Sequence, residues 1–415
     1  MKIGIDIRTL MDIQYSGIPE YTLNLIKEIL KLDKKNEYKL FYNSGKDISD
    51  KIPKFDNAEI IKTNYPNKLF NNLMQRVLGA PKIDQLIKAD IFFMPNIGFV
   101  SLSNRCKKII TIHDLSFLRF PEFFSLKRRI WHGIINIKKI LNQFDKIIAV
   151  SENTKNDLID LCNIKAEKIK VIYHGVGGEY KVIEPNNQKL NEVKKKYALP
   201  DDFILYLGTL EPRKNVEGII QAYGELREKN KPRTKDISCR RHYTTDCDKL
   251  FNHPNLSEEF FVRGKNLENF KLVIAGGRGW KYKNIFKIWS ESKYKDSIIF
   301  LGYIEGADKV YLYNLASLFV YPSFYEGFGL QLLEAMACGT PVTCSFTSSL
   351  PEVAGGAAVM VDPYDTNNIA SAMEQILTDN EFKNDLIKKG LAQAKRFSWE
   401  KTAGEHLDLF KVLDV

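Results

Sequence analysis

The sequence predicts an α/β protein built from two doubly wound domains, each a sheet flanked by helices. Its 415 residues are too many for one ordinary hydrophobic core. Short β-branched and apolar runs alternate with helical stretches along the chain, which is typical of strands joined by crossover helices. A polar, highly charged stretch at residues 181–199 separates an N-terminal from a C-terminal series of such runs. We therefore place the domain boundary near residue 180.

Each strand is predicted from a short apolar run rich in β-branched residues. In residues 1–180 the predicted strands are Ile3–Ile7, Tyr38–Tyr42, Ile91–Met94, Lys108–Ile112, Lys146–Val150 and Ile169–Ile172. In residues 181–398 they are Phe203–Leu207, Lys271–Ile274, Ile298–Phe300, Leu318–Tyr321, Val342–Cys344 and Ala358–Val361. The segment after Ser398 is predicted to form an amphipathic helix, because Ser398 is a good N-cap residue and apolar positions recur behind it.

A polar insertion is predicted at residues 229–269, between a helix at Val216–Arg227 and the strand that begins at Lys271. A short turn would be enough to join these two elements. The insertion contains two cysteines and two histidines, so a metal site is an alternative; these residues are Cys239, His242, Cys247 and His253. Their spacing fits no common zinc pattern, which favours a surface insertion.

Composition limits the possible classes of protein. With 44% hydrophobic and 27% charged residues, the chain is typical of a soluble globular protein. It has no run of 18 apolar residues that would span a membrane, and residues 2–7 are predicted to be a first buried strand, not a signal peptide. The six cysteines are irregularly spaced, which predicts no disulfide framework and favours a reducing compartment.

The net charge of +10 lies entirely in residues 1–183, which contain 30 Lys and Arg against 20 Asp and Glu. This asymmetry predicts an anionic partner for the first domain: a membrane surface, a lipid diphosphate or a nucleic acid. No zinc-finger or RNP-type sequence supports nucleic acid. A predicted helix at Leu126–Leu141 combines apolar residues with five cations. We favour membrane contact for this helix over a core helix with a solvated basic face.

The most informative stretch runs from Tyr321 to Val342. Two carboxylates, Glu326 and Glu334, are separated by seven residues, and a helix that opens at the intervening Gly-Phe-Gly turn would place both along one side. Backbone N–H groups at the start of such a helix are unpaired and attract an anion. The stretch therefore predicts a site for a polyol that carries a phosphate group.

A second candidate site follows the predicted strand at Phe203–Leu207. Arg213 and Lys214 would lie at the mouth of the next helix, at the carboxyl end of the strand, where open α/β sheets bind ligands. Cations near a helix N-terminus are disfavoured by the helix dipole. This electrostatic cost favours a functional role for the pair, with an anionic ligand as the partner.

The stretch Tyr321–Val342 resembles the E-x7-E signature of family 4 glycosyltransferases, retaining enzymes of the GT-B fold. Three further motifs follow the order of that family: Tyr-Ser-Gly-Ile at 15–18, His-Asp-Leu at 113–115 and Leu-Glu-Pro-Arg-Lys-Asn at 210–215. The resemblance implies two Rossmann-like domains that face a central cleft. Residues 1–180 would bind the acceptor and residues 181–398 the sugar nucleotide, with a C-terminal helix at about 399–415 packed on the first domain. Pro19 and Glu20 replace the second glycine and the basic residue usual in the family, so the acceptor contacts there stay open.

The resemblance also implies roles for individual residues. Arg213 and Lys214 would hold the donor diphosphate and stabilise the leaving group. Glu326 would grip sugar hydroxyls, Glu334 the ribose, and His113 the far edge of the sugar. These roles make Glu326, His113, Arg213 and Lys214 the predicted catalytic residues. The other predicted donor-binding residues are Gly17, Gly276, Gly277, Tyr303, Ile304, Gly327, Phe328, Gly329, Leu330 and Glu334.

The implied reaction is transfer of a hexose from a nucleoside diphosphate to a lipid-linked saccharide. The motifs look most like bacterial mannosyltransferases of surface-polysaccharide assembly, which implies GDP-mannose as the donor, the cytoplasmic face of the inner membrane as the location, and O-antigen, capsule or exopolysaccharide as the product. No metal or other cofactor is expected, because no Asp-x-Asp cluster follows a predicted strand. The alternatives are a UDP-sugar-dependent enzyme of the same fold, an NDP-sugar epimerase or hydrolase, and a non-catalytic sugar-nucleotide-binding relative.

Overall fold

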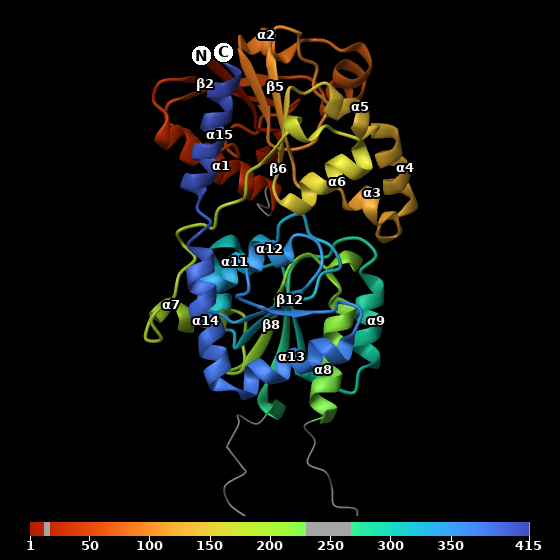
Figure 1. Ribbon diagram of the computed structural model, residues 1–415, viewed down its shortest axis with the longest axis vertical. Coiled ribbons are helices and arrows are strands. Elements are labelled where there is room, and N and C mark those ends of the chain that lie inside the picture. Colours follow the sequence, from red (N-terminus) through yellow and green to blue (C-terminus); the bar gives the residue numbers. More distant parts are fainter. Residues whose placement is uncertain (12–16, 230–266, 415) are drawn as a thin grey trace, which may run out of the picture.

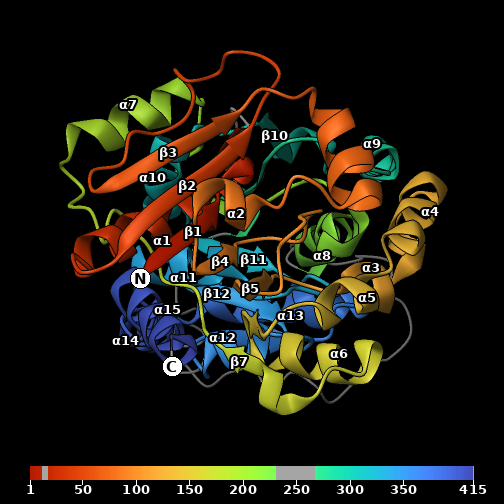
Figure 2. The ribbon, with the colours of Figure 1, turned by 90° about the horizontal axis from the view of Figure 1, so that it is seen from above.

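Two α/β domains lie one above the other in the computed structural model, which describes residues 1–11, 17–229 and 267–414 (Figure 1). The first domain contains a seven-stranded sheet and the second a six-stranded sheet, and the pairings in both are parallel. Viewed from above, the sheet of the first domain lies over that of the second (Figure 2). The predicted fold class is confirmed. The residues of the insertion proposed as an alternative metal site lie outside the described residues.

The first sheet has the strand order β3-β2-β1-β4-β5-β6-β7. Its strands are β1 (Lys2–Asp6), β2 (Glu37–Asn43), β3 (Ala58–Thr63), β4 (Ile91–Met94), β5 (Lys107–Ile112), β6 (Lys146–Ala149) and β7 (Ile169–Val171). Six of them were predicted; β3 was not. It is an edge strand with no buried residue, so its sequence lacks the apolar run that marks a buried strand.

Short crossover helices connect the strands of the first domain. They are η1 (Arg8–Met11), α1 (Ile18–Leu32), η2 (Leu69–Leu78), α2 (Ile83–Ile87), α3 (Ser116–Arg119), η3 (Pro121–Phe123), α4 (Leu126–Ile135), α5 (Ile137–Asn142), α6 (Glu152–Cys162) and η4 (Ala166–Lys168). The prediction of a single helix at 126–141 is wrong, because the structure has two helices there, α4 and α5. They are divided by Asn136, which adopts a left-handed conformation with φ 45° and caps α5 through its side chain.

The second sheet has the order β10-β9-β8-β11-β12-β13. Its strands are β8 (Phe203–Leu207), β9 (Lys271–Ala275), β10 (Ile298–Gly302), β11 (Leu318–Tyr321), β12 (Val342–Ser345) and β13 (Val359–Val361), all at predicted positions. The helices are α7 (Gln188–Lys196), η5 (Pro212–Lys214), α8 (Val216–Lys229), η7 (Leu267–Asn269), α9 (Lys283–Glu291), η8 (Lys295–Ser297), η9 (Gly306–Asp308), α10 (Lys309–Leu315), α11 (Leu330–Ala337), α12 (Leu350–Ala354), α13 (Thr366–Thr378) and α14 (Asn380–Ala394).

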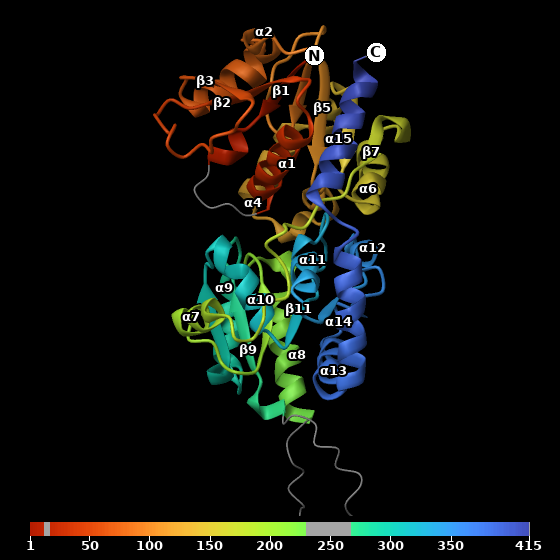
Figure 3. The ribbon, with the colours of Figure 1, turned by 90° about the vertical axis from the view of Figure 1, so that its left-hand side faces the viewer.

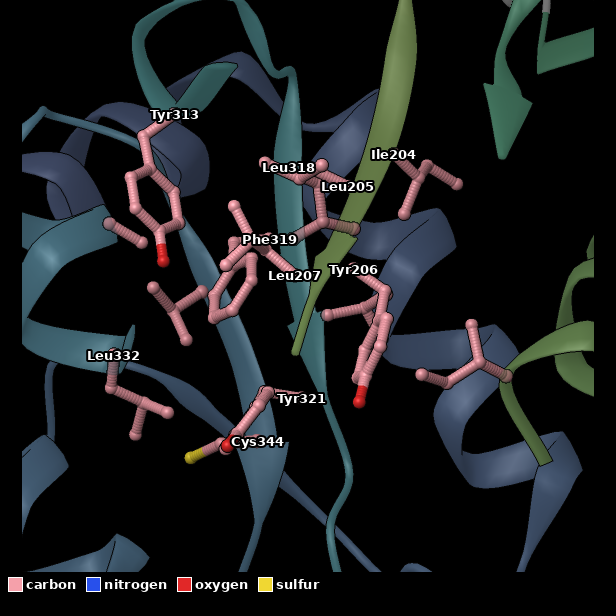
Figure 4. Close-up of a cluster of buried hydrophobic side chains, with 14 of the residues drawn as sticks. Ile204, Leu205, Tyr206, Leu207, Tyr313, Leu318, Phe319, Tyr321, Leu332 and Cys344 are labelled. Carbon is pink, nitrogen blue, oxygen red and sulfur yellow. The ribbon is translucent and has the colours of Figure 1, made fainter. Parts of the chain in front are cut away.

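Buried aromatic side chains fill the centre of the second domain. Tyr206, Phe319 and Tyr321 stand on neighbouring strands, and their rings lie close together (Figure 4). Each is fully buried. Tyr321 is the last residue of β11 and Tyr206 the last but one of β8, so their hydroxyl groups reach the carboxyl edge of the sheet, where the polar site begins.

The last helix, α15 (Trp399–Leu413), crosses back from the second domain to the first, where it lies beside α1 (Figures 1 and 3). Ser398 caps it by accepting a hydrogen bond from the N–H of Lys401 at 3.2 Å. Trp399 and Phe410 are part of the same buried cluster as Tyr21 and Leu25 of α1. The C-terminal residues therefore complete the core of the first domain.

The two domains also contact each other through a capped helix. The carboxylate of Glu352, on α12 of the second domain, accepts hydrogen bonds from the N–H groups of Glu152 and Asn153 at 3.0 and 3.1 Å. These are the first two residues of α6 in the first domain, whose N–H groups have no partner within the helix. The Tyr173 hydroxyl donates to the same carboxylate at 3.0 Å. A charge-assisted contact thus joins the domains at a helix N-terminus.

Candidate functional site

A buried ion-pair cluster forms at the carboxyl end of β8. The short helix η5 presents Lys214, whose Nζ donates to Oε1 of Glu326 at 2.6 Å, and Arg213, whose Nη1 donates to Oε2 at 3.0 Å. Arg213 also pairs with the buried carboxylate of Glu211, and Lys214 donates to the Tyr321 hydroxyl at 2.6 Å. Two cations and two carboxylates therefore compensate each other in a site where Lys214 and Glu326 are 6% and 5% exposed.

Neighbouring positive charges keep the carboxyl group of Glu326 ionised. Burial alone would raise the pKa of its carboxyl group, but the charges of Lys214 and Arg213 outweigh burial and lower the pKa to about 2. Burial and the neighbouring Arg213 lower the pKa of Lys214, against the attraction of Glu326 and Glu211. Both cations are thus neutralised by carboxylates within the cluster.

The Gly-Phe-Gly turn follows Glu326 and leads into α11. Ser349 holds its shape by donating to the carbonyl groups of Glu326 and Phe328, both at 2.9 Å. Among the described residues, the N–H groups of residues 327–329 have no hydrogen-bond partner. They stand at the N-terminal end of α11, where unpaired N–H groups favour an anion or an electronegative oxygen. The structure therefore places three free donors directly after Glu326.

Gly327 brings this turn against the first domain. A Cβ atom at this position would lie 1.7 Å from the carbonyl oxygen of His113, so only glycine fits while the domains are in contact. The carbonyl group of Gly327 accepts hydrogen bonds from the hydroxyls of Ser151 and Thr154 at 2.7 and 3.2 Å. Ser151 is also the N-cap of α6, so its hydroxyl contributes both to the helix and to the domain contact.

His113 lies at the carboxyl end of β5, on the first-domain side of this contact. Its Nε2 lies 2.8 Å from the carbonyl oxygen of Pro95. A carbonyl can only accept, so Nε2 carries the proton and Nδ1 is left as the acceptor. Burial lowers the pKa of the ring to about 4, which keeps it neutral at pH 7. His113 is therefore placed to accept a hydrogen bond from a hydroxyl group.

Glu334 belongs to a separate cluster. It is fully buried on α11, where it accepts a hydrogen bond from the Tyr313 hydroxyl at 2.7 Å. Burial raises its pKa to about 7, which the nearby Lys309 partly opposes. Lys309 in turn pairs with Glu20 of the first domain at 3.1 Å. The expectation that Glu326 and Glu334 share one helical side is wrong, because α11 begins only at Leu330 and Glu326 lies in the preceding loop.

The remaining predicted donor-binding residues of the second domain lie at the ends of β9 and β10. Gly276 adopts φ 140°, and a Cβ atom there would lie 1.9 Å from the Gly208 carbonyl oxygen, so close backbone packing already explains this glycine. Gly277 has open space where a side chain would stand. Tyr303 is 45% exposed, whereas Ile304 is buried. The exposed tyrosine and open Gly277 leave this sheet edge accessible to a ligand.

In the first domain, Gly17 is the N-cap of α1 and has open space above it. A cavity of about 540 Å³ opens at the carboxyl ends of β1 and β4. Its lining is Asp6, Arg8, Thr9, Ile18, Pro19, Asn71, Asn72, Pro95, Asn96, Ile97, Gly98, Phe99 and Ile140. Arg8 is engaged by Asp6 and donates to the Phe99 carbonyl at 3.1 Å, so the described part of the lining offers amide and hydroxyl groups without a free cation. This lining suits a neutral polyol better than a phosphate.

The described residues thus separate into a charged site on the second domain and a neutral cavity on the first. The structure brings Glu326 together with Arg213, Lys214 and residues 327–329, and sets His113 against Gly327. It holds Glu334 apart. Glu211, Lys309 and Glu20 also belong to these clusters, although their motifs did not predict it. Glu211 precedes Arg213 in a quoted motif, but only the fold brings Lys309 and Glu20 together.

Within the described chain no group of His, Cys, Asp or Glu is arranged to hold a metal ion. None of the described helices combines the length and the apolar character that a membrane span needs.

A buried histidine behind the site makes stability depend on pH. His406 of α15 is fully buried between the Thr402 carbonyl at 2.7 Å and the Tyr21 hydroxyl at 3.1 Å, and burial lowers its pKa from 6.5 to about 4. The neutral ring stabilises the fold above pH 6.5, and this stabilisation is lost as the pH falls from 6.5 toward 4. Between pH 7 and pH 5 we expect a loss of about 2 kcal/mol from this ring.

Thermal unfolding at pH 7 and pH 5 would measure this effect, with His406→Gln as the comparison. Glutamine keeps hydrogen-bonding groups but does not titrate, so the variant should lose less stability on acidification than the wild type. Equal losses in the two proteins would contradict the role of His406.

Two families match the chain in separate segments. Residues 15–177 match Glycosyltransferase Family 4, and residues 252–393 match Glycosyl transferases group 1. The O-antigen chain mannosyltransferase B of Escherichia coli is 31% identical over 411 residues, which cover 96% of both chains. The serotype-specific mannosyltransferase WbdA of Escherichia coli is 32% identical over 297 residues, covering 72% of this chain and 32% of that protein.

Solved structures with low sequence identity share the fold. Sucrose-phosphate synthase from Thermosynechococcus elongatus superposes with a TM-score of 0.71 at 18% identity, covering 99% of this chain and 98% of that chain. Anabaena HepE, solved in complex with UDP and glucose, gives a TM-score of 0.67 at 17% identity and covers 99% of this chain and 100% of that chain. WaaG, a glycosyltransferase involved in lipopolysaccharide biosynthesis, gives 0.64 at 12% identity and covers 99% of both chains.

Proposed function

Because the chain belongs to the family 4 glycosyltransferases, we propose that it is a retaining mannosyltransferase that transfers mannose from GDP-mannose to a lipid-linked saccharide. The observation that supports mannose as the donor sugar is the similarity, over 96% of the chain, to an O-antigen chain mannosyltransferase. The three free N–H groups of residues 327–329, which stand at the N-terminal end of α11 beside the cluster of Arg213, Lys214 and Glu326, support the assignment of an anionic donor to the second domain. The products are an extended glycan and GDP.

In this proposal the bond between the sugar C1 and the diphosphate oxygen breaks first, and the electron pair leaves with GDP. Arg213 and Lys214 stabilise the charge that grows on the departing oxygen. The acceptor hydroxyl attacks C1 from the same face and passes its proton to the departing phosphate. Glu326 and the free N–H groups of residues 327–329 orient sugar hydroxyls, and Nδ1 of His113 accepts from another. None of these steps uses a metal ion or a further cofactor.

The acceptor saccharide lies in the neutral cavity of the first domain, next to Gly17. Its lipid anchor lies in the cytoplasmic leaflet of the inner membrane, to which the protein attaches peripherally. The excess positive charge of residues 1–183 supports this placement, since anionic lipids attract basic surfaces. Polymers assembled on such anchors include O-antigen, capsule and exopolysaccharide.

Thermal-shift titration with GDP, UDP, ADP and CDP, followed by their sugar conjugates, tests the donor. A ligand at 100 times its dissociation constant stabilises the folded protein by about 2.7 kcal/mol, which is readily measured. We expect selective stabilisation by GDP and GDP-mannose. A response to UDP alone would replace the donor and keep the fold and the site. A protein that responds to none of the four would contradict the sugar-nucleotide site.

A further inference from the structure

The helix η2 has two chemically different sides. One side faces the first domain, where Phe70 and Gln75 are buried and Asn71 accepts a hydrogen bond from Nη1 of Arg8 at 2.8 Å. Asn71 and Asn72 line the neutral cavity to which the acceptor saccharide is assigned. The helix therefore forms part of the wall of that cavity.

The other side carries an exposed apolar stripe, made of Leu69, Leu73, Val77 and Leu78. These side chains are 43%, 44%, 69% and 64% exposed. η2 is a π-helix, and Leu69, Leu73 and Val77 recur every four residues, a little less than one of its turns, so they follow one side of the helix. Single exposed apolar residues are ordinary, but four on a helix of ten residues leave a continuous apolar surface without a described partner.

The charged residues on η2 and its immediate flanks are cations. Residues 63–82 contain Lys68, Arg76 and Lys82 and no Asp or Glu, whereas Glu59 and Asp84 lie beyond them and Lys62 is paired with Asp47. A helix with an apolar side flanked only by cations suits an anionic lipid surface, where apolar residues enter the headgroup region and the cations meet lipid phosphates. A symmetric contact with a second copy would place the same cations against each other, which charge repulsion disfavours.

We propose that the exposed apolar stripe of η2 docks on an anionic lipid bilayer and thereby holds the mouth of the neutral cavity at the membrane surface. This inference rests on the proposed function and identifies the surface by which the enzyme meets its lipid-linked acceptor. One helix would contact the bilayer with its apolar side and the acceptor saccharide with its asparagines.

The basic helix favoured by the sequence is less available for this role. Arg128 of α4 lies over the ring of Trp280 in the second domain, 4.2 Å from the ring centroid, and Trp280 donates to the Phe123 carbonyl at 2.8 Å. The N-terminal part of α4 is thus held at the domain contact. We therefore assign the membrane surface to η2.

Vesicle co-sedimentation of the full chain tests this assignment. The probes are vesicles of phosphatidylcholine alone and vesicles in which one third of the lipid is phosphatidylglycerol. The Leu73→Glu/Val77→Glu variant should bind the anionic vesicles at least tenfold more weakly than the wild type. A matched control, Val182→Glu/Val412→Glu, adds the same charge at residues that are 55% and 65% exposed elsewhere, and should bind as the wild type does.

Unchanged binding by the stripe variant, or an equal loss in the control, would overturn the proposal. So would a wild type that binds neither vesicle, or one that binds both equally. If gel filtration without lipid shows that the stripe variant dissociates a dimer, a second copy covers the stripe and the proposal is wrong.

Turnover of GDP-mannose with a lipid-free saccharide acceptor should be the same in wild type, stripe variant and control. Absence of that turnover in the wild type would contradict the proposed function and leave the vesicle result intact.

Discussion

Replacing Lys214 by alanine is expected to lower kcat by about 10²–10³-fold, the usual cost of removing one group that stabilises transition-state charge. Lys214 lies 2.6 Å from Glu326 and is 6% exposed, so its charge acts in a site with little solvent screening. Arg213 would remain paired with Glu326 and hold the carboxylate in place. We expect weaker binding of GDP as well, since Lys214 meets the diphosphate in both the ground state and the transition state.

Lys293→Ala is the matched control, because Lys293 also belongs to the second domain but is exposed and pairs with Glu228 at the surface. Its steady-state kinetics should equal those of the wild type. Since breaking a buried ion pair costs about 3–5 kcal/mol, each variant is assayed well below its own melting temperature. Near-normal kcat in a folded Lys214→Ala protein would show that the cluster does not act on the leaving group.

Replacing Gly327 by alanine is expected to lower kcat/KM by about 10²-fold, because the added methyl group separates groups that must act together. Its carbon would lie 1.7 Å from the His113 carbonyl oxygen and 2.9 Å from Cβ of Asp114, both in the first domain. The clash lies between the domains, so each domain should keep its own core. Small-angle scattering should report a larger radius of gyration for the variant, and donor kinetics the loss of rate.

Gly404→Ala provides the control for Gly327. No atom lies within 4 Å of a Cβ at this position, which is in the middle of α15, so the variant should retain activity and unfold at the same or a slightly higher temperature. A Gly327→Ala protein with full activity and an unchanged radius of gyration would mean that the contact with His113 is not needed for transfer.

Much of the fold could be predicted because the sheets are buried on both faces. Strands such as Phe203–Leu207 are continuous apolar runs between polar connections, and this pattern can be recognised in a single sequence. The edge strand β3 escaped, because Glu59 and Lys62 interrupt its apolar residues where the sheet meets solvent. The break at Asn136 was not predicted. A residue in the left-handed conformation can also end a turn, so the local sequence does not show that Asn136 divides the helix.

The site could be predicted only as far as its motifs reach. Glu326, Arg213 and Lys214 each stand in a recognisable motif, and the fold brings them within hydrogen-bond distance. The partners of Glu334 come from two separate places in the chain: Tyr313 and Lys309 both lie on α10, and Glu20, which pairs with Lys309, lies on α1. Glu20 stands where the resemblance implies a basic residue, and it forms an ion pair with Lys309 of the second domain. No local pattern predicts such a contact, because it depends on how the two domains meet.

The return of α15 to the first domain has a consequence for biosynthesis. The first domain is made first, but part of its core comes from Trp399, Leu409 and Phe410. At about 5–20 residues per second, the ribosome needs roughly 10–50 s to add the chain between β7 and α15. During that time the apolar surface of α1 around Leu25 and Tyr21 lacks the side chains that cover it in the folded protein. The nascent first domain therefore completes its core only when the last helix leaves the ribosome.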